Sequence, residues 1–242
     1  RGPGGIPVTA SVLLGKHQEM RERLERRFLE IQTRYASRMR CSGGCARCCR
    51  GLFDIPLPDA FLVARAFGAL PAEIRAPVAG RAARIQRRLL SEAPGLDPPF
   101  FLTSLSEEEI DRLVEALTGT ACPFLDGEER CLIYDFRPLA CLLEGIPMVD
   151  LSDGLFGDWC ELNFREGVSA EMERDLALDY YEIEAAGSAL SEALAQHVLG
   201  IGRREVRLFI PSIVAGYADY WAPAMERSGC RGKTLSTGGW RP

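Results

Sequence analysis

Four cysteines stand within nine residues, in the segment CSGGCARCC from Cys41 to Cys49. Four more follow in the middle of the chain, and a ninth, Cys230, lies in a polar tail. A chain of 242 residues can bury a hydrophobic core without covalent staples, so a small core does not explain these cysteines. Cys230 is not expected to be a ligand. We expect metal binding by the first eight cysteines, Cys41, Cys45, Cys48, Cys49, Cys122, Cys131, Cys141 and Cys160.

The spacing of the thiols constrains the fold. Cys45-x-x-Cys48 is typical of zinc and iron–sulfur sites alike, because a tight turn brings both thiolates to one point about 2.3 Å away. Cys41 adds a third thiol, and a fourth ligand has to come from the next cysteine or from the second block. The spacing therefore predicts that residues 41–49 and 122–160 meet in space.

Cys48 and Cys49 are adjacent, and neighbouring side chains usually diverge. One thiol of this pair can serve a first metal and the other a second, which gives two four-thiolate sites. Alternatively, one is a ligand and the other packs in the core. A disulfide between adjacent residues would be strained. Gly43 and Gly44 allow the backbone to fold tightly between the thiols.

Residues other than cysteine give little support for different chemistry. The only histidines, His17 and His197, are expected to be surface or packing residues, so a Cys–His or Ser–His–Asp catalytic group is disfavoured. Arginines beside the cysteines can offset thiolate charge: Arg40, Arg47, Arg50, Arg130 and Arg137.

Composition excludes several classes of partner. The net charge of −5 gives no general affinity for nucleic acid or membrane surfaces. The chain has no run of about 18 apolar residues that could span a bilayer, and its first residues lack the order of a signal peptide. We therefore expect a cytoplasmic protein, in which clustered cysteines indicate metal or redox chemistry before disulfides.

Apolar periodicity predicts a mainly α fold. Ser106 and Glu109 form a capping box at the start of one helix. Asp126-Gly127 predicts a short hairpin-like turn, Pro138 begins a short helix that carries Cys141, and residues 148–158 are expected to be loop. Helices are predicted over residues 15–39, 59–67, 71–90 (or 77–90), 106–119, 169–200 and 211–225.

These elements predict three parts. Residues 1–40 form an N-terminal tail and helix. Residues 41–165 form an irregular cysteine-rich metal-binding domain with a helical insertion and a short hairpin. Residues 166–242 form a C-terminal helical extension.

The order CxxxCxxCC, CPFL, CLIYDFRPLAC and WC resembles the CxxCxxCC, or YkgJ-type, cysteine cluster family of zinc- or iron-chelating domains. The resemblance covers Cys41 to Cys160 and maps all eight cysteines onto the family's own. The first gap is longer than in the shortest form of the pattern. The resemblance implies metal binding without an assigned activity.

Two enzyme classes share part of this pattern. Flagellin lysine-N-methylase has the same cysteine pattern, but the present chain is shorter and has no glycine-rich loop that would bind S-adenosylmethionine. Cys41, Cys45 and Cys48 match the three-cysteine signature of radical S-adenosylmethionine enzymes. The segments that follow are helical and broken by prolines, which disfavours the parallel barrel of that class.

The leading hypothesis is an iron–sulfur protein with one or two 4Fe–4S clusters, because the thiols are clustered without histidine. Its role would be electron transfer or a redox-assisted modification, as an oxidoreductase or a protein-modifying enzyme, with a protein or electron-transfer partner. The alternatives are a zinc-stabilised interaction module and a metal-handling protein.

Overall fold

The computed structural model describes residues 9–41, 44–157, 159–202 and 205–228, and it confirms the mainly α class. Cys230 and Gly43 lie outside these ranges. No helix of the described residues combines the length and the apolar character needed to cross a membrane. The principal helices are α1 (Ala10–Arg34), α2 (Leu57–Ala69), α3 (Ala72–Glu92), α4 (Glu107–Ala116), α5 (Leu139–Leu143), α6 (Ala170–Leu176), α7 (Tyr180–Leu194), α8 (Ile210–Ala215) and α9 (Ala222–Arg227).

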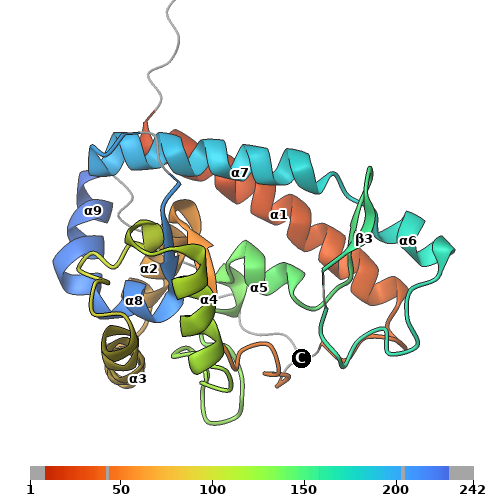
Figure 1. The fold of residues 1–242 in the computed structure, drawn as a ribbon, viewed down its shortest axis with the longest axis horizontal. Coiled ribbons are helices and arrows are strands. Elements are labelled where there is room, and N and C mark those ends of the chain that lie inside the picture. Colours follow the sequence, from red (N-terminus) through yellow and green to blue (C-terminus); the bar gives the residue numbers. More distant parts are fainter. Residues whose placement is uncertain (1–8, 42–43, 158, 203–204, 229–242) are drawn as a thin grey trace, which may run out of the picture.

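Helices α1 and α7 run side by side across the molecule (Figure 1). Helix α1 begins earlier than predicted, because the hydroxyl of Thr9 accepts a hydrogen bond from the backbone N–H of Val12 and caps the helix. Its apolar residues recur every three or four positions, and one stripe is buried, including Leu24, Phe28 and Ile31.

The largest hydrophobic cluster lies beneath this pair and is built mainly on α2, most of whose side chains are buried. Two short antiparallel strands, β1 (Asp54–Pro56) and β4 (Arg207–Phe209), join the beginning of α2 to α8. The chain therefore returns after α7 to the segment that leaves the first cysteine block.

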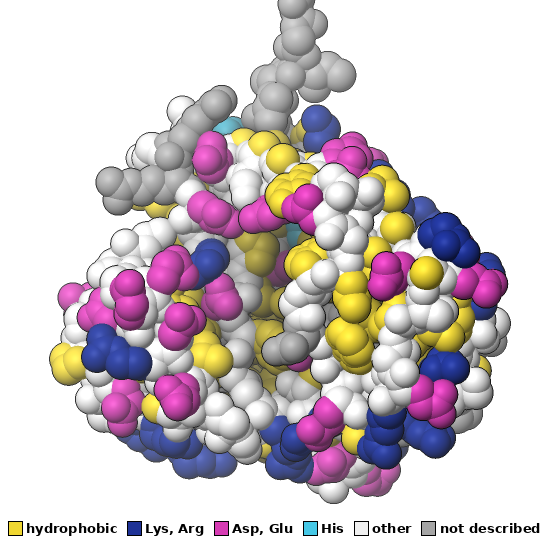
Figure 2. Space-filling view, turned by 45° about the vertical axis from the view of Figure 1, so that its right-hand side comes forward, with side chains coloured by type: hydrophobic (Ala, Val, Ile, Leu, Met, Phe, Trp, Pro, Cys, Tyr) yellow, Lys and Arg dark blue, Asp and Glu magenta, His cyan; other side chains and the backbone are white. Residues whose placement is uncertain are grey.

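A second hydrophobic cluster fills the space between α3 and α4. The predicted capping box is confirmed: the Ser106 hydroxyl accepts from the N–H of Glu109, and the Glu109 carboxylate accepts from the N–H of Ser106. Figure 2 shows that one face of the molecule is hollowed, with hydrophobic side chains at the floor of the hollow and charged side chains around it.

The cysteine-rich middle contains little regular structure. The Asp126-Gly127 turn is confirmed: an isolated bridge pairs Leu125 with Cys131, and the N–H of Leu132 donates to the carbonyl of Phe124. The short helix after Pro138 is α5. The prediction of loop over residues 148–158 is wrong in part, because β2 (Met148–Asp150) and β3 (Gly154–Phe156) form a hairpin.

The single helix predicted over residues 169–200 is also wrong. It divides into α6 and α7 because the N–H of Leu178 donates to the carbonyl of Val149, and the carbonyl of Leu178 accepts from Leu151. This pairing with the hairpin takes the backbone out of the helix. Asp179 then starts α7 by accepting a hydrogen bond from the N–H of Glu182. After α7, a single π turn, η3 (Ala195–Leu199), ends at Gly200.

The helix predicted over residues 211–225 is likewise interrupted. Helix α8 ends at Gly216, a π turn η4 (Tyr217–Trp221) follows, and Pro223 lies in the first turn of α9. Two 3₁₀ turns, η1 (Leu102–Ser104) and η2 (Tyr134–Phe136), complete the described elements.

Candidate metal centre

Backbone pairing brings the two cysteine blocks together. The N–H of Cys122 donates to the carbonyl of Cys49 over 2.8 Å, and an antiparallel bridge joins Arg50 to Ala121. On the other side, the N–H of Phe164 donates to the carbonyl of Arg38 over 2.8 Å. The predicted meeting of residues 41–49 with residues 122–160 is therefore confirmed.

All eight predicted cysteines line one pocket. None of the eight forms a disulfide. Most of the remaining wall is apolar and includes Phe28, Phe53, Phe124 and Ile133. The predicted site residues are thus gathered in one largely apolar pocket, although the sequence distributes them over 120 positions from Cys41 to Cys160.

The thiols form two sets of three. Cys41, Cys45 and Cys160, the Cys41 set, lie close enough for charge on one to raise the pKa of another. Cys122, Cys131 and Cys141, the Cys122 set, are related in the same way.

Cys48 lies near members of both sets. Cys48 repels members of both, and its own pKa is raised, first by its hydrogen bond with Cys49 and then by burial. The two adjacent thiols therefore lie close to each other, and the expectation that they diverge is wrong here. Charge on Cys48 also raises the pKa of members of both sets.

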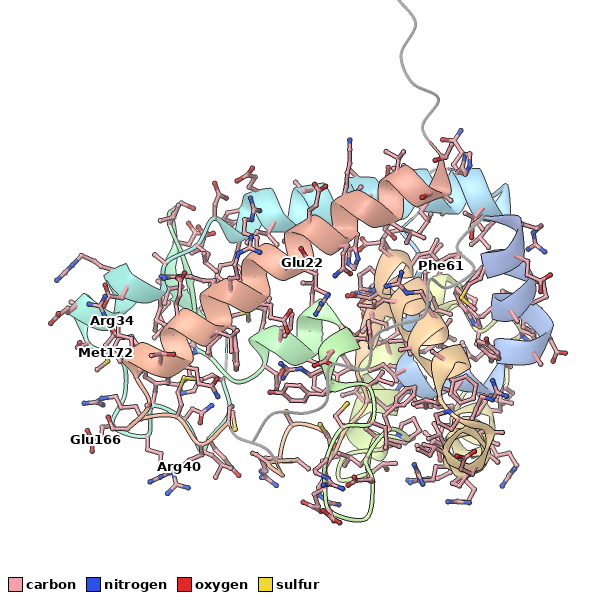
Figure 3. The ribbon with its side chains drawn as sticks, turned by 180° about the vertical axis from the view of Figure 1, so that it is seen from behind. Glu22, Arg34, Arg40, Phe61, Glu166 and Met172 are labelled. Carbon is pink, nitrogen blue, oxygen red and sulfur yellow. The ribbon has the colours of Figure 1, made fainter. Side chains whose placement is uncertain are left out.

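The Cys122 set and Cys41 pack against different parts of the core. The three thiols of the Cys122 set contact the largest hydrophobic cluster, around α2. Cys41 contacts a smaller cluster formed by the end of α1, the β2–β3 hairpin region and α6, including Phe28, Val149 and Phe164. Figure 3 shows this end of the molecule, where Arg34 of α1 lies beside Met172 of α6.

Burial is the main influence on most of these thiols. It raises the pKa of Cys122 to about 12 and the pKa of Cys131, Cys141 and Cys160 in the same direction. Burial also raises the pKa of Cys41, against the hydrogen bond from Asn163, which lowers it. Without a cation, the site therefore favours neutral thiols.

Positive charge reaches the Cys122 set from two arginines. Arg137 lowers the pKa of Cys131 and stacks on Tyr134, with its guanidinium carbon 3.7 Å from the ring centroid. Arg81 of α3 lowers the pKa of Cys122 and donates to the carbonyl of Pro123. The sequence predicted Arg137 but not Arg81, since α3 is far from the cysteines along the chain.

The other predicted arginines have different partners. The side chains of Arg47, Arg50 and Arg130 form ion pairs with Glu161, Glu129 and Asp126, respectively. Only the backbone N–H of Arg40 has a described role, as a donor to the side chain of Asn163. In Figure 3 the Arg40 side chain extends outward at the edge of the molecule.

Three further residues escaped the sequence analysis. Glu144 is near Cys48 and Cys160, whose pKa it raises, and burial raises its own pKa. Gly145 lies against Cys41: a Cβ added there would be 2.7 Å from the sulfur. Asn163 donates a hydrogen bond to the Cys41 sulfur. No sequence signal marks these three, because their neighbours become apparent only in the folded chain.

His17 is a buried packing residue, and it also lies against a buried carboxylate. His17 is only 3% exposed, and its Nε2 lies 3.2 Å from Oδ1 of the fully buried Asp59. The other carboxylate oxygen of Asp59 accepts from the N–H of Leu139, at the start of the helix that carries Cys141. The buried pair therefore supports one wall of the site.

The donor set fits zinc or iron, since thiols from both blocks line one pocket and no histidine is among its described lining residues. Within the described ranges, no three cysteine, histidine, aspartate or glutamate side chains are placed to share one metal ion. Thiolates repel one another, and a bound metal ion overcomes this repulsion by holding each sulfur about 2.3 Å from itself.

Comparisons with curated proteins and with solved structures give no match. One family model matches residues 40–161, which is half of the chain and includes all eight cysteines of the pocket. It is the model of the CxxCxxCC family, described as "Putative zinc- or iron-chelating domain". The chain belongs to this family of metal-chelating cysteine cluster proteins.

Proposed function

We propose that the eight cysteines hold iron–sulfur clusters and that the protein transfers electrons or assists a redox modification of a protein partner. The observation that carries the proposal is the gathering of all eight thiols, with no described histidine, around one largely apolar pocket. Iron–sulfur clusters are held by cysteine thiolates in sets of four, whereas zinc sites often include histidine.

The two sets of three thiols support two four-thiolate sites. One site uses the Cys41 set and the other uses the Cys122 set, and Cys48 and Cys49 each complete one of them. Cys48 lies near members of both sets and Cys49 is its immediate partner, which supports this division.

A cluster would supply reversible one-electron chemistry, and the protein would tune it. The apolar wall formed by Phe28, Phe124 and Ile133 keeps water from the sulfurs. Arg81 and Arg137 offset part of the thiolate charge at the Cys122 set. Electrons would come from a protein partner in the cytoplasm.

The division of the chain into residues 1–40, 41–165 and 166–242 stays a prediction.

The test is the visible spectrum of anaerobically purified protein, recorded before and after reduction. The account predicts a brown protein whose absorbance near 400 nm, typical of cubane clusters, bleaches reversibly. Cys45→Ser and Cys141→Ser should each remove about half of the metal, because they belong to different sets. A colourless wild-type protein would overturn the proposal.

A zinc-stabilised interaction module is the second candidate. The scarcity of regular structure around α5 favours it, because bound metal can hold such a segment in place. In this case the protein is colourless, contains zinc without sulfide, and loses structure when a chelator removes the metal.

A further inference from the structure

Asn163 is the only asparagine in the chain, and its side chain is buried, with 1% of the residue exposed. It lies three positions after Cys160, just beyond the segment that matches the family model. A buried amide needs partners for both its oxygen and its nitrogen. The partners described for its side chain are Arg40, Cys41 and Gly145, and the last two line the cysteine pocket.

The amide is held by three contacts. Its oxygen accepts from the backbone N–H of Arg40 over 2.6 Å. Its nitrogen donates to the carbonyl of Gly145 and to the sulfur of Cys41, the latter over 3.1 Å. The orientation is fixed, because a flipped amide would place its oxygen against the Gly145 carbonyl and its nitrogen against the N–H of Arg40.

The backbone around Asn163 is fixed as well. Its N–H donates to the carbonyl of Cys160 over 2.9 Å, and its carbonyl accepts from the indole N–H of Trp159 over 3.0 Å. On the far side, the Cys41 sulfur lies against Gly145, where any side chain would collide with it. Asn163 thus connects Cys41 with Cys160, two members of one set.

An amide N–H binds a neutral thiol weakly, because thiol sulfur is a poor acceptor. The same bond is charge-assisted and stronger when the sulfur is a thiolate. Hydrogen bonds to ligand sulfurs also orient the ligand and tune the properties of the bound metal. The contact therefore has its full effect only in the metal-bound form.

We propose that Asn163 is a positioning residue that donates a hydrogen bond to the Cys41 thiolate when the Cys41 set binds metal. The proposal rests on the proposed metal binding by this set. Its alternative is a purely structural role, in which Asn163 only connects Arg40 with Gly145. The two roles differ in what the loss of the sulfur contact does to the bound metal.

A matched control comes from Gln32 of α1, whose amide nitrogen donates to the backbone carbonyl of Cys41. Asn163→Asp and Gln32→Glu make the same change, from amide to carboxyl, at two side chains that contact the same cysteine. Only the first removes a donor to the sulfur. Asn163→Asp also keeps an oxygen that can accept from Arg40.

The experiment titrates metal-free protein with Co²⁺ without oxygen and records the thiolate-to-cobalt charge-transfer band. The phase that disappears in Cys41→Ser reports on the Cys41 set. Asn163→Asp should lower the Co²⁺ affinity of that phase by about 10- to 100-fold and move its charge-transfer band to lower energy. Gln32→Glu should change the affinity by less than about threefold and leave the band in place.

Added to Cys41→Ser, the Asn163→Asp change should have no further effect on Co²⁺ binding, because its target sulfur is gone. If Asn163→Asp fails to fold, Asn163→Ser replaces it in the test, because serine is smaller and introduces no clash. It should show the same loss of Co²⁺ affinity. An unchanged phase and band in a folded Asn163 variant would overturn the proposal, as would an equal loss in Gln32→Glu. If wild-type protein binds no Co²⁺, the proposed metal binding fails too.

Discussion

Asp59 links the hydrophobic core to the cysteine pocket. Its carboxylate is fully buried between His17 of α1 and the first N–H of α5. Removing the carboxylate leaves the buried His17 ring and the N–H of Leu139 without this partner, and an unsatisfied buried polar group costs about 1–3 kcal/mol. Asp59→Ala should therefore lower the free energy of unfolding by about this amount, measured in urea.

The matched control is the double variant His17→Leu with Asp59→Leu, which removes both polar side chains together. It should be less destabilised than the sum of the two single variants. Simple additivity, or a fully stable Asp59→Ala protein, would contradict the role assigned to the pair.

Asp150 predicts a dependence of stability on pH. Its carboxylate accepts from the hydroxyl and N–H of Ser152 and from the N–H of Tyr180, and these bonds lower its pKa to about 2. Because the folded pKa lies below the usual value of 3.8, the stabilisation is present above pH 3.8 and is lost as the pH falls towards 2.

The measurement is urea unfolding of metal-free protein at several values between pH 2 and pH 6. Wild-type protein should lose more stability on acidification than Asp150→Asn, which has no charge to lose. Parallel curves would show that these hydrogen bonds do not depend on the carboxylate charge.

Helix α4 depends on its capping box. Ser106→Ala removes the hydroxyl that accepts from Glu109 and should cost about 1 kcal/mol of stability. Ser91→Ala is the control, because that exposed hydroxyl donates to the carbonyl of Arg88 near the end of α3 and caps no N–H group. It should change stability by less than about 0.5 kcal/mol. Equal effects of the two substitutions would mean that the cap contributes nothing.

Local signals predicted some elements well and others poorly. Ser106 and Glu109 determine the start of α4 through neighbouring residues alone, so the sequence was sufficient. The division between α6 and α7 depends on Leu178 bonding to the β2–β3 hairpin, almost 30 residues earlier. The periodicity of apolar residues does not report such a distant partner, so the prediction of one long helix is wrong at Leu178.

The whole molecule should respond unevenly to loss of metal. The segment from Gly119 to Asn163 has little regular structure and surrounds the pocket, whereas α2 lies in the largest hydrophobic cluster. Metal removal should speed amide hydrogen exchange in the first segment by at least about tenfold and leave α2 protected. Exchange that rises equally everywhere, or nowhere, would contradict a metal centre in this pocket.

The cysteine pattern alone predicted which thiols come together, because the spacing of metal-binding cysteines can be recognised along the sequence. It could not divide them into sets, since Cys160 of the second block lies near Cys41 and Cys45 of the first only in the folded chain. Asn163 and Gly145 were also out of reach. Their role lies in contacts with Cys41 made across more than 100 residues of chain.

The most direct measurement is the content of iron, zinc and acid-labile sulfide per chain in protein purified without oxygen. The account predicts iron and sulfide in equal amounts, on the order of eight of each if both four-thiolate sites hold a cubane. Zinc without sulfide would contradict the iron–sulfur assignment and favour the zinc-stabilised module. The absence of both metals would contradict metal binding by the eight cysteines altogether.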